Sequence, residues 1–227
     1  MKLAALGDSI IKGVIVKPEG NKVRYSLAEH SIVDRCAQGL NSEAINLGKM
    51  GCTIEAGEHI LDKRLDKLGD TKYILLECGG NDSDYNWQAI AENPGAIHQP
   101  NTPLDRYINT YERIIKKIQN IGAVPLVLSL PPMDAERYFA FFSSQWREEW
   151  KENVMYWLGH STNRIMSGHE LYNMATWKIA QNTGAHWIDI TSELLQQRQY
   201  NQYLCDDGIH PNEEGQARIA DIILRTL

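Results

Sequence analysis

A chain of 227 residues is long enough to form one α/β domain with a sizeable buried core. Its net charge of −6 argues against nucleic acid or an anionic membrane as a partner, because both are bound through clustered positive charge. No apolar stretch approaches the length of a membrane-spanning helix.

Apolar, strand-like runs alternate with helix-like stretches along the chain. The apolar runs predict strands over residues 3–6, 44–47, 73–78, 124–130 and 187–190. Apolar residues at helical spacing predict helices over residues 26–40, 54–68, 105–121, 170–183 and 212–227. Alternation of this kind predicts βαβ units, and therefore an α/β fold with helices on both faces of a parallel sheet.

Two segments do not fit this alternation. Residues 83–104 form a long mixed connection, and residues 133–163 are dense in aromatic side chains. Each follows a predicted strand whose end should lie near a binding site. Because no repeat or linker divides the chain, we interpret residues 1–227 as a single domain with two insert segments.

Small and polar residues follow the first three predicted strands. Ser9 comes after the first strand, Gly48 after the second and Asn81 after the third. Ligands of open parallel sheets bind beyond the carboxyl ends of the strands. The pattern therefore predicts that these three residues share one site.

Four short motifs contain these residues and one histidine. They are Gly7-Asp8-Ser9-Ile10, Asn46-Leu47-Gly48-Lys49-Met50-Gly51, Gly79-Gly80-Asn81-Asp82 and Asp207-Gly208-Ile209-His210-Pro211. Serine, glycine, asparagine and histidine in this order resemble the SGNH (GDSL-type) hydrolase family of esterases and lipases. The resemblance runs from residue 7 to residue 211 and implies a three-layer α/β/α, flavodoxin-like sandwich around a five-stranded parallel sheet.

The serine and histidine motifs contain the parts of a nucleophilic catalyst. A serine hydroxyl needs a base within hydrogen-bond reach, and His210 can take and return its proton. Asp207 lies three residues before His210, a spacing at which a tight turn can bring its carboxylate to the far ring nitrogen. Asp206 is an alternative carboxylate, but only Asp207 matches the spacing of the family.

Attack on an ester carbonyl places negative charge on its oxygen, and hydrogen-bond donors aimed at that oxygen are a large catalytic term. The resemblance implies an oxyanion hole built from the backbone N–H groups of Ser9 and Gly48 and the side-chain amide of Asn81. We interpret Asp8 and Asp82 as residues that brace the turns around this site.

The combination predicts a serine esterase that cleaves carboxylic esters of small molecules through an acyl-enzyme. Short acyl or acetyl esters are favoured, with a carbohydrate as one candidate for the alcohol part. Two alternatives stay open. One is an acyltransferase or thioesterase that uses the same triad, and the other is a non-catalytic α/β binding module.

Other kinds of site lack their signatures. His169-Glu170 has no second histidine of a His-Glu-x-x-His zinc motif, and the chain contains no phosphate-binding loop and no Gly-x-Ser-x-Gly elbow. We therefore expect no metal and no organic cofactor.

Tyr85 and Trp87 closely follow Asn81 and are our candidates for contacts with substrate. The aromatic residues of segment 133–163 have two interpretations. They form a lid, a pocket wall or a stacking platform for a sugar, or else they pack a helical insert against the body or form a subunit interface, and we favour the second interpretation for most of them. A subunit interface leaves a homo-oligomer open.

We expect a cytoplasmic protein. Glycine interrupts the first apolar run after four residues, far short of the apolar region of a signal peptide. The four cysteines form no Cys-x-x-Cys pair, and free thiols suit a reducing compartment.

Overall fold

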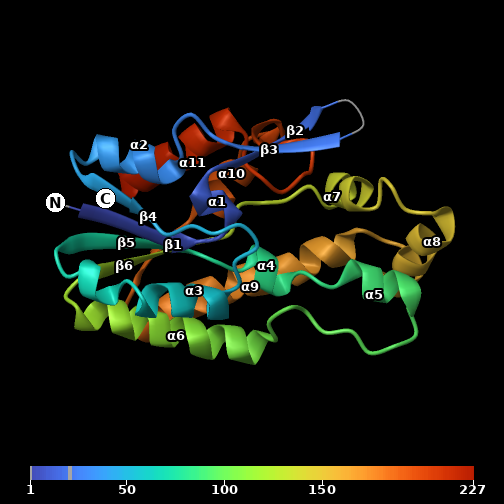
Figure 1. Cartoon of the computed structure of the whole chain (residues 1–227), viewed down its shortest axis with the longest axis horizontal. Helices are drawn as coiled ribbons and strands as arrows, with labels where there is room; N and C mark the ends of the chain where they lie inside the picture. Colours follow the sequence, from blue (N-terminus) through green and yellow to red (C-terminus); the bar gives the residue numbers. More distant parts are fainter. Residues whose placement is uncertain (1, 20–21) are drawn as a thin grey trace.

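The computed structural model describes residues 2–19 and 22–227. Its centre is a five-stranded sheet in the order β4-β1-β5-β6-β7, in which every pair of neighbours is parallel (Figure 1). The strands are β1 (Lys2–Gly7), β4 (Glu43–Asn46), β5 (Thr71–Glu77), β6 (Val124–Leu128) and β7 (His186–Ile188). Each lies on a segment predicted from the sequence. In chain order the sheet reads 2-1-3-4-5, so the flavodoxin-like α/β fold is confirmed.

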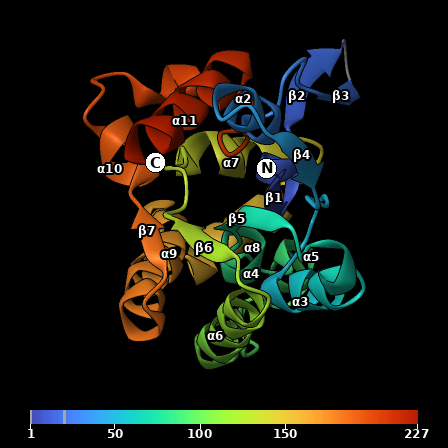
Figure 2. The same ribbon diagram turned by 90° about the vertical axis from the view of Figure 1, so that its left-hand side faces the viewer.

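Helices cover both faces of the sheet and complete the three layers (Figure 2). The helices α2 (Ile32–Gly39), α10 (Ile190–Leu195) and α11 (Glu213–Thr226) pack on one face, and α3 (Ile54–Asp62), α6 (Leu104–Asn120) and α9 (Asn163–Thr183) on the other. Side chains alternate between the faces along each strand. In β1, Leu3 and Ala5 point toward α2 and α11, whereas Ala4 and Leu6 point toward α3 and α6.

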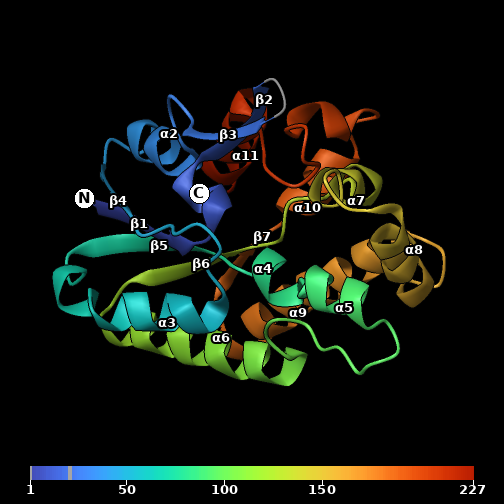
Figure 3. The ribbon, with the colours of Figure 1, turned by 45° about the vertical axis from the view of Figure 1, so that its right-hand side comes forward.

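The insert segments gather beyond the carboxyl ends of the strands (Figures 1 and 3). The first segment contains α5 (Trp87–Glu92), which follows the short α4 (Gly80–Ser83), and the second contains α7 (Ala135–Phe142) and α8 (Glu148–Trp157). These three helices pack around a separate apolar cluster. The expectation that both segments lie near strand ends agrees with this placement.

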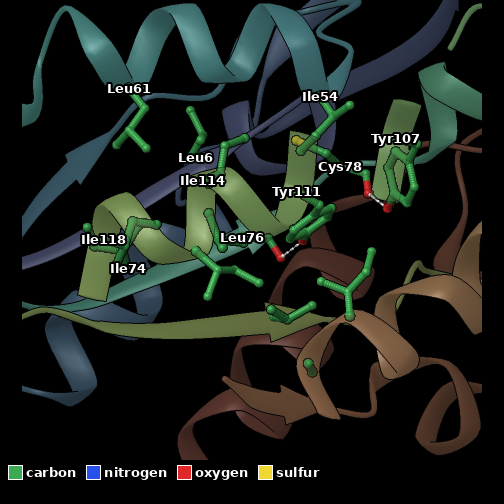
Figure 4. Close-up of a cluster of buried hydrophobic side chains, with 14 of the residues drawn as sticks. Leu6, Ile54, Leu61, Ile74, Leu76, Cys78, Tyr107, Tyr111, Ile114 and Ile118 are labelled. Atoms are coloured by element: carbon green, nitrogen blue, oxygen red, sulfur yellow. Dashed lines mark hydrogen bonds between the residues drawn. The ribbon is translucent and has the colours of Figure 1, made fainter. Parts of the chain in front are cut away.

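The larger core lies between the sheet and the α3, α6 and α9 layer (Figure 4). One face of α6 carries the buried side chains of Tyr107, Tyr111, Ile114 and Ile118 at helical spacing. The hydroxyl of Tyr107 donates a hydrogen bond to the carbonyl of Cys78 at 2.6 Å, and that of Tyr111 donates to the strand carbonyl of Leu76 at 3.1 Å. These bonds fix α6 against β5 and the turn that follows it.

An antiparallel hairpin, β2 (Val14–Glu19) and β3 (Lys22–Leu27), occupies sequence that we assigned to connections and to the start of a helix. Because β3 continues to Leu27, the helix predicted over residues 26–40 begins only at Ile32. Ser31 starts it with a capping box, in which its side chain and that of Asp34 bond each other's backbone N–H. The remaining elements are α1 (Ser9–Lys12) and the 3₁₀ turns η1 (Leu65–Lys67) and η2 (Tyr200–Tyr203). No helix among the described residues is long and apolar enough to cross a membrane.

Candidate active site

Ser9 stands at the carboxyl end of β1, in the turn that joins this strand to α1. Asp8 caps the short helix, because its Oδ1 accepts a hydrogen bond from the backbone N–H of Ile10 at 2.8 Å. Only glycine fits at position 7, where an added Cβ would lie 2.4 Å from the carbonyl oxygen of Glu77. The turn therefore holds Ser9 in one place, with 7% of its surface exposed.

The structure brings Ser9, His210 and Asp207 into one hydrogen-bonded chain. Ser9 Oγ lies 2.8 Å from His210 Nε2, and His210 Nδ1 lies 2.5 Å from Asp207 Oδ2. The other oxygen of Asp207 accepts the backbone N–H groups of Ile209 at 3.2 Å and His210 at 3.1 Å. Because Nδ1–H donates a hydrogen bond to the carboxylate, Nε2 carries the lone pair and can accept the proton of the serine hydroxyl. Asp206, the alternative carboxylate, is exposed.

Asn81 lies on α4, which begins directly after β5, and it lines the same cavity as Ser9. Its Nδ2 donates one hydrogen bond to Asp8 Oδ2 at 2.9 Å. An amide nitrogen carries two hydrogens, so one remains for a ligand in the cavity. The neighbouring Gly79 has a φ of +148°, a conformation that side chains rarely adopt.

Gly48 does not lie at this site, and the expectation for it is corrected by the structure. Its backbone N–H donates to Asn46 Oδ1 at 2.8 Å, and an added Cβ would lie 2.4 Å from the backbone nitrogen of Lys12. Gly51, three residues later, lines the cavity instead, with a φ of +68°. Within the described residues its N–H has no hydrogen-bond partner. Both glycines stand in one six-residue motif, and the resemblance to the family was applied to Gly48, whereas the glycine of this motif that lines the cavity is Gly51.

Two buried carboxyl groups lie beneath the nucleophile. Glu77 ends β5 opposite Gly7 and is 1% exposed, and its carboxyl group shares a side-chain hydrogen bond with the carboxyl group of Asp8. Burial and the nearby Asp8 raise the pKa of Glu77 well above its ordinary value. Burial also raises the pKa of Asp8, but the N–H of Ile10 opposes that shift. We therefore assign the proton to Glu77 and the negative charge to Asp8.

Asp82, which follows Asn81 on α4, connects this helix to the start of α3. Its two oxygens accept the backbone N–H of Ile54, the first residue of α3, at 2.9 and 3.1 Å. Burial raises the pKa of this carboxyl to about 6. These contacts agree with the bracing role expected from the sequence.

The triad opens onto a cavity of about 200 Å³ with mostly apolar walls. Tyr85 and Trp87 both lie in its wall, as does Tyr138 from the aromatic segment. Trp87 is fixed by a 2.7 Å hydrogen bond from its Nε1 to Asp84 and by stacking on Phe142, with ring centroids 5.1 Å apart. Contact of Tyr85 and Trp87 with substrate stays a prediction.

Other parts of the wall were not found from the sequence. Ile165 and His169 of α9 and Ile209 beside His210 line the cavity, although their helical or loop spacing resembles that of ordinary packed residues. Most aromatic residues of segment 133–163 pack against one another. Across residues 2–19 and 22–227, no group of three or more His, Cys, Asp or Glu side chains is arranged to hold a metal ion.

Residues 5–218 match the GDSL-like lipase/acylhydrolase family. The chain belongs to this family. Membership makes the protein an ester-bond hydrolase, and the recognised SGNH resemblance is confirmed. A search of curated protein sequences finds no match.

Solved structures of this fold cover almost the whole chain at low identity. A lipase/acylhydrolase from Enterococcus faecalis is 17% identical, with a TM-score of 0.65, over 99% of this chain and 94% of that one. A catalytic mutant of an acetylxylan esterase from Geobacillus stearothermophilus is 18% identical, with a TM-score of 0.65, over 99% and 92%. The acetyl xylan esterase AlAXEase is 17% identical, with a TM-score of 0.63, over 100% of both chains.

Proposed function

We propose that this hydrolase is a serine esterase that removes short acyl groups, acetyl above all, from a small hydroxylated alcohol such as a sugar. The observation that carries the proposal is the hydrogen-bonded chain from Ser9 through His210 to Asp207 at the edge of the cavity. A binding module would not require this complete chain. Two of the structural relatives are acetylxylan esterases, which supports an acetylated carbohydrate as the substrate.

In the first half of the reaction, Ser9 Oγ attacks the ester carbonyl while His210 Nε2 takes its proton. Asp207 stabilises the imidazolium that forms. The carbonyl oxygen becomes an oxyanion, and the donors available to it are the N–H of Ser9, the free hydrogen of the Asn81 amide and the N–H of Gly51. His210 then gives its proton to the departing alcohol, which leaves an acyl group on Ser9.

In the second half, water replaces the alcohol. His210 takes a proton from this water, which attacks the acyl-enzyme carbonyl and forms a second oxyanion in the same place. When the intermediate collapses, the acid leaves and the proton returns to Ser9.

The test is hydrolysis of p-nitrophenyl acetate, butyrate and octanoate by the wild type and by Ser9→Ala. We expect kcat to fall by about 10³-fold or more in the variant, and the wild type to prefer the acetyl ester. Ser167→Ala is the matched control, because this serine is exposed on α9 and its hydroxyl bonds only the carbonyl of Asn163 among the described residues. Equal rates for wild type and Ser9→Ala would show that Ser9 is not the nucleophile and would favour a non-catalytic binding module.

A second measurement separates hydrolysis from acyl transfer. The products of acetyl ester cleavage are analysed in the presence of glycerol or xylose. We expect acetate as the main product, and acetyl groups found mainly on the added alcohol would instead identify an acyltransferase.

A further inference from the structure

A second imidazole lies in the wall of the active-site cavity, and the reaction above does not use it. His169 of α9 lines the same cavity as Ser9 and His210 but is only 9% exposed. Its Nδ1 is buried and forms no hydrogen bond within the described residues, and it lies 3.5 Å from Glu170 Oε1. Nε2 also forms no hydrogen bond within the described residues, but unlike Nδ1 it has accessible surface. Nε2 is therefore the ring nitrogen available to the cavity.

The neighbours of His169 decide which hydrogen bond Nε2 can make. The contact with His169 lowers the pKa of Glu170, which is also held by the side-chain amide of Asn173 at 3.0 Å, so Glu170 stays ionised. A carboxylate beside Nδ1 favours the tautomer with the proton on Nδ1. In that tautomer Nε2 carries a lone pair and accepts a hydrogen bond.

The nearby Asp84 is engaged by the aromatic wall of the cavity. Its two oxygens already accept hydrogen bonds from Trp87 Nε1 and from the hydroxyl of Tyr138, both at 2.7 Å. These bonds fix the aromatic wall in place. Nε2 of His169, in contrast, has no hydrogen-bond partner among the described residues.

The charge of the cavity points to a neutral ligand. The described residues that line it include Asp8 and Asp84 but no lysine or arginine. An anionic substrate would meet carboxylates without a fixed cation to oppose them. A hydroxyl group is neutral and donates the hydrogen bond that Nε2 can accept.

We propose that His169 is a specificity-determining residue, whose Nε2 accepts a hydrogen bond from a hydroxyl group on the alcohol part of the ester. The inference rests on the proposed function. An acetyl group is small compared with a cavity of about 200 Å³, so most of the space is available to the alcohol. Apolar side chains such as Trp87 and Ile165 would contact the C–H groups of a polyol or sugar, while His169 binds one of its hydroxyls.

This arrangement selects against plain esters. When an alcohol without hydroxyls fills the cavity, the buried imidazole loses water and gains no partner. A site built to bind a hydroxyl rejects the analogue that lacks it for this reason. The enzyme should therefore hydrolyse esters of polyols faster than matched esters of simple alcohols.

The test compares glycerol monoacetate with propyl acetate, which has the same carbon chain without the two hydroxyls. The readout is the ratio of kcat/KM for the two esters. In His169→Leu we expect this ratio to fall by about 10-fold, mainly because KM for glycerol monoacetate rises while kcat changes little. His169→Gln keeps a side-chain acceptor and should restore much of the ratio. His169→Met serves if the leucine variant does not fold.

The control is His186→Leu, an exposed histidine of β7 outside the cavity wall, which should keep the wild-type ratio. A folded apolar variant with the wild-type ratio would overturn the role of His169. An equal loss on both esters would also overturn it, because a structural defect does not distinguish them. If the wild type shows no Ser9-dependent hydrolysis of p-nitrophenyl acetate, the proposed function itself is wrong, and the two failures are thereby separated.

Discussion

Alanine substitutions at Gly48 and Gly51 should both destabilise the fold, but only the substitution at Gly51 should slow catalysis strongly. The sequence places Gly48 in the oxyanion hole, whereas in the structure its N–H is bound by Asn46 and Gly51 lines the cavity. We therefore expect Gly48→Ala mainly to lower the stability of the fold and Gly51→Ala mainly to lower kcat.

The expected magnitudes follow from the space around each glycine. A Cβ on Gly48 would lie 2.4 Å from the nitrogen and 2.8 Å from the Cα of Lys12, and these backbone atoms cannot rotate away. Such overpacking costs about 1–3 kcal/mol. A Cβ on Gly51 meets no atom within 4 Å, but its φ of +68° costs an alanine about 1–2 kcal/mol. We therefore expect Gly48→Ala to lose at least as much unfolding free energy as Gly51→Ala.

Catalysis separates the two variants more clearly. An alanine at position 51 relieves its strain by turning the backbone, which moves the N–H away from the cavity. A displacement of about 1 Å at a catalytic group lowers kcat by about 10²-fold. Gly48→Ala has no donor at the cavity to lose, so its folded fraction should keep kcat within a few-fold of the wild type.

The measurements are urea unfolding and steady-state kinetics on p-nitrophenyl acetate for both variants. Active-site titration corrects kcat for any unfolded protein. The reasoning would be refuted if Gly48→Ala kept wild-type stability but lost most of its kcat while Gly51→Ala stayed fully active. The backbone N–H of Gly48 would then be the oxyanion donor.

Three further predictions concern the groups around the nucleophile. Asp207→Asn leaves the histidine with the wrong tautomer and should lower kcat by about 10²-fold or more, measured on the same ester. Glu77 has a raised pKa when folded, so its contribution to stability is present below the unfolded pKa of about 4.3 and is lost as pH rises through the folded value. Glu77→Gln removes this loss, and its melting temperature relative to wild type should rise between pH 5 and pH 8; a constant difference would mean that Glu77 is ionised in the fold. Tyr107→Phe leaves the buried carbonyl of Cys78 without its partner and should cost about 1–3 kcal/mol in urea unfolding, while an unchanged midpoint would show that another donor replaces it.

The sheet could be predicted because its strands are covered on both faces. The segments that became β5 and β6 are almost continuously apolar, since neither face of a central parallel strand meets water. The chemistry of the nucleophile was also local. Ser9 depends on a turn next to its own strand, and Asp207 and His210 depend on a turn of three residues, so both are written in short motifs.

The rest of the site depends on contacts between distant segments. Gly48 and Gly51 look alike in the sequence, and only the path of the chain past Lys12 shows which one faces the cavity. His169 occupies a helix position that resembles an ordinary core position, and its exposure to the cavity requires α9 to lie beside α4. The β2–β3 hairpin was missed although the sequence carries a signal for it, since an apolar run at residues 14–16, a Gly-Asn pair and an alternating run from Val23 are typical of a β-hairpin.

The buried carboxyl group of Glu77 has opposite consequences for stability and for catalysis. Its burial costs stability, but its neutral form keeps negative charge away from the place where the oxyanion forms. The cost of burying this carboxyl group would be avoided by an apolar residue at this position. Its neutral form nevertheless adds no negative charge beneath the developing oxyanion, whereas the charge of Asp8 is offset by hydrogen bonds from the N–H of Ile10 and the amide of Asn81. The hydrogen bond from Asn81 that offsets the charge of Asp8 also aligns the Asn81 amide, so the proton on Glu77, which leaves Asp8 ionised, supports the geometry of the proposed oxyanion donor.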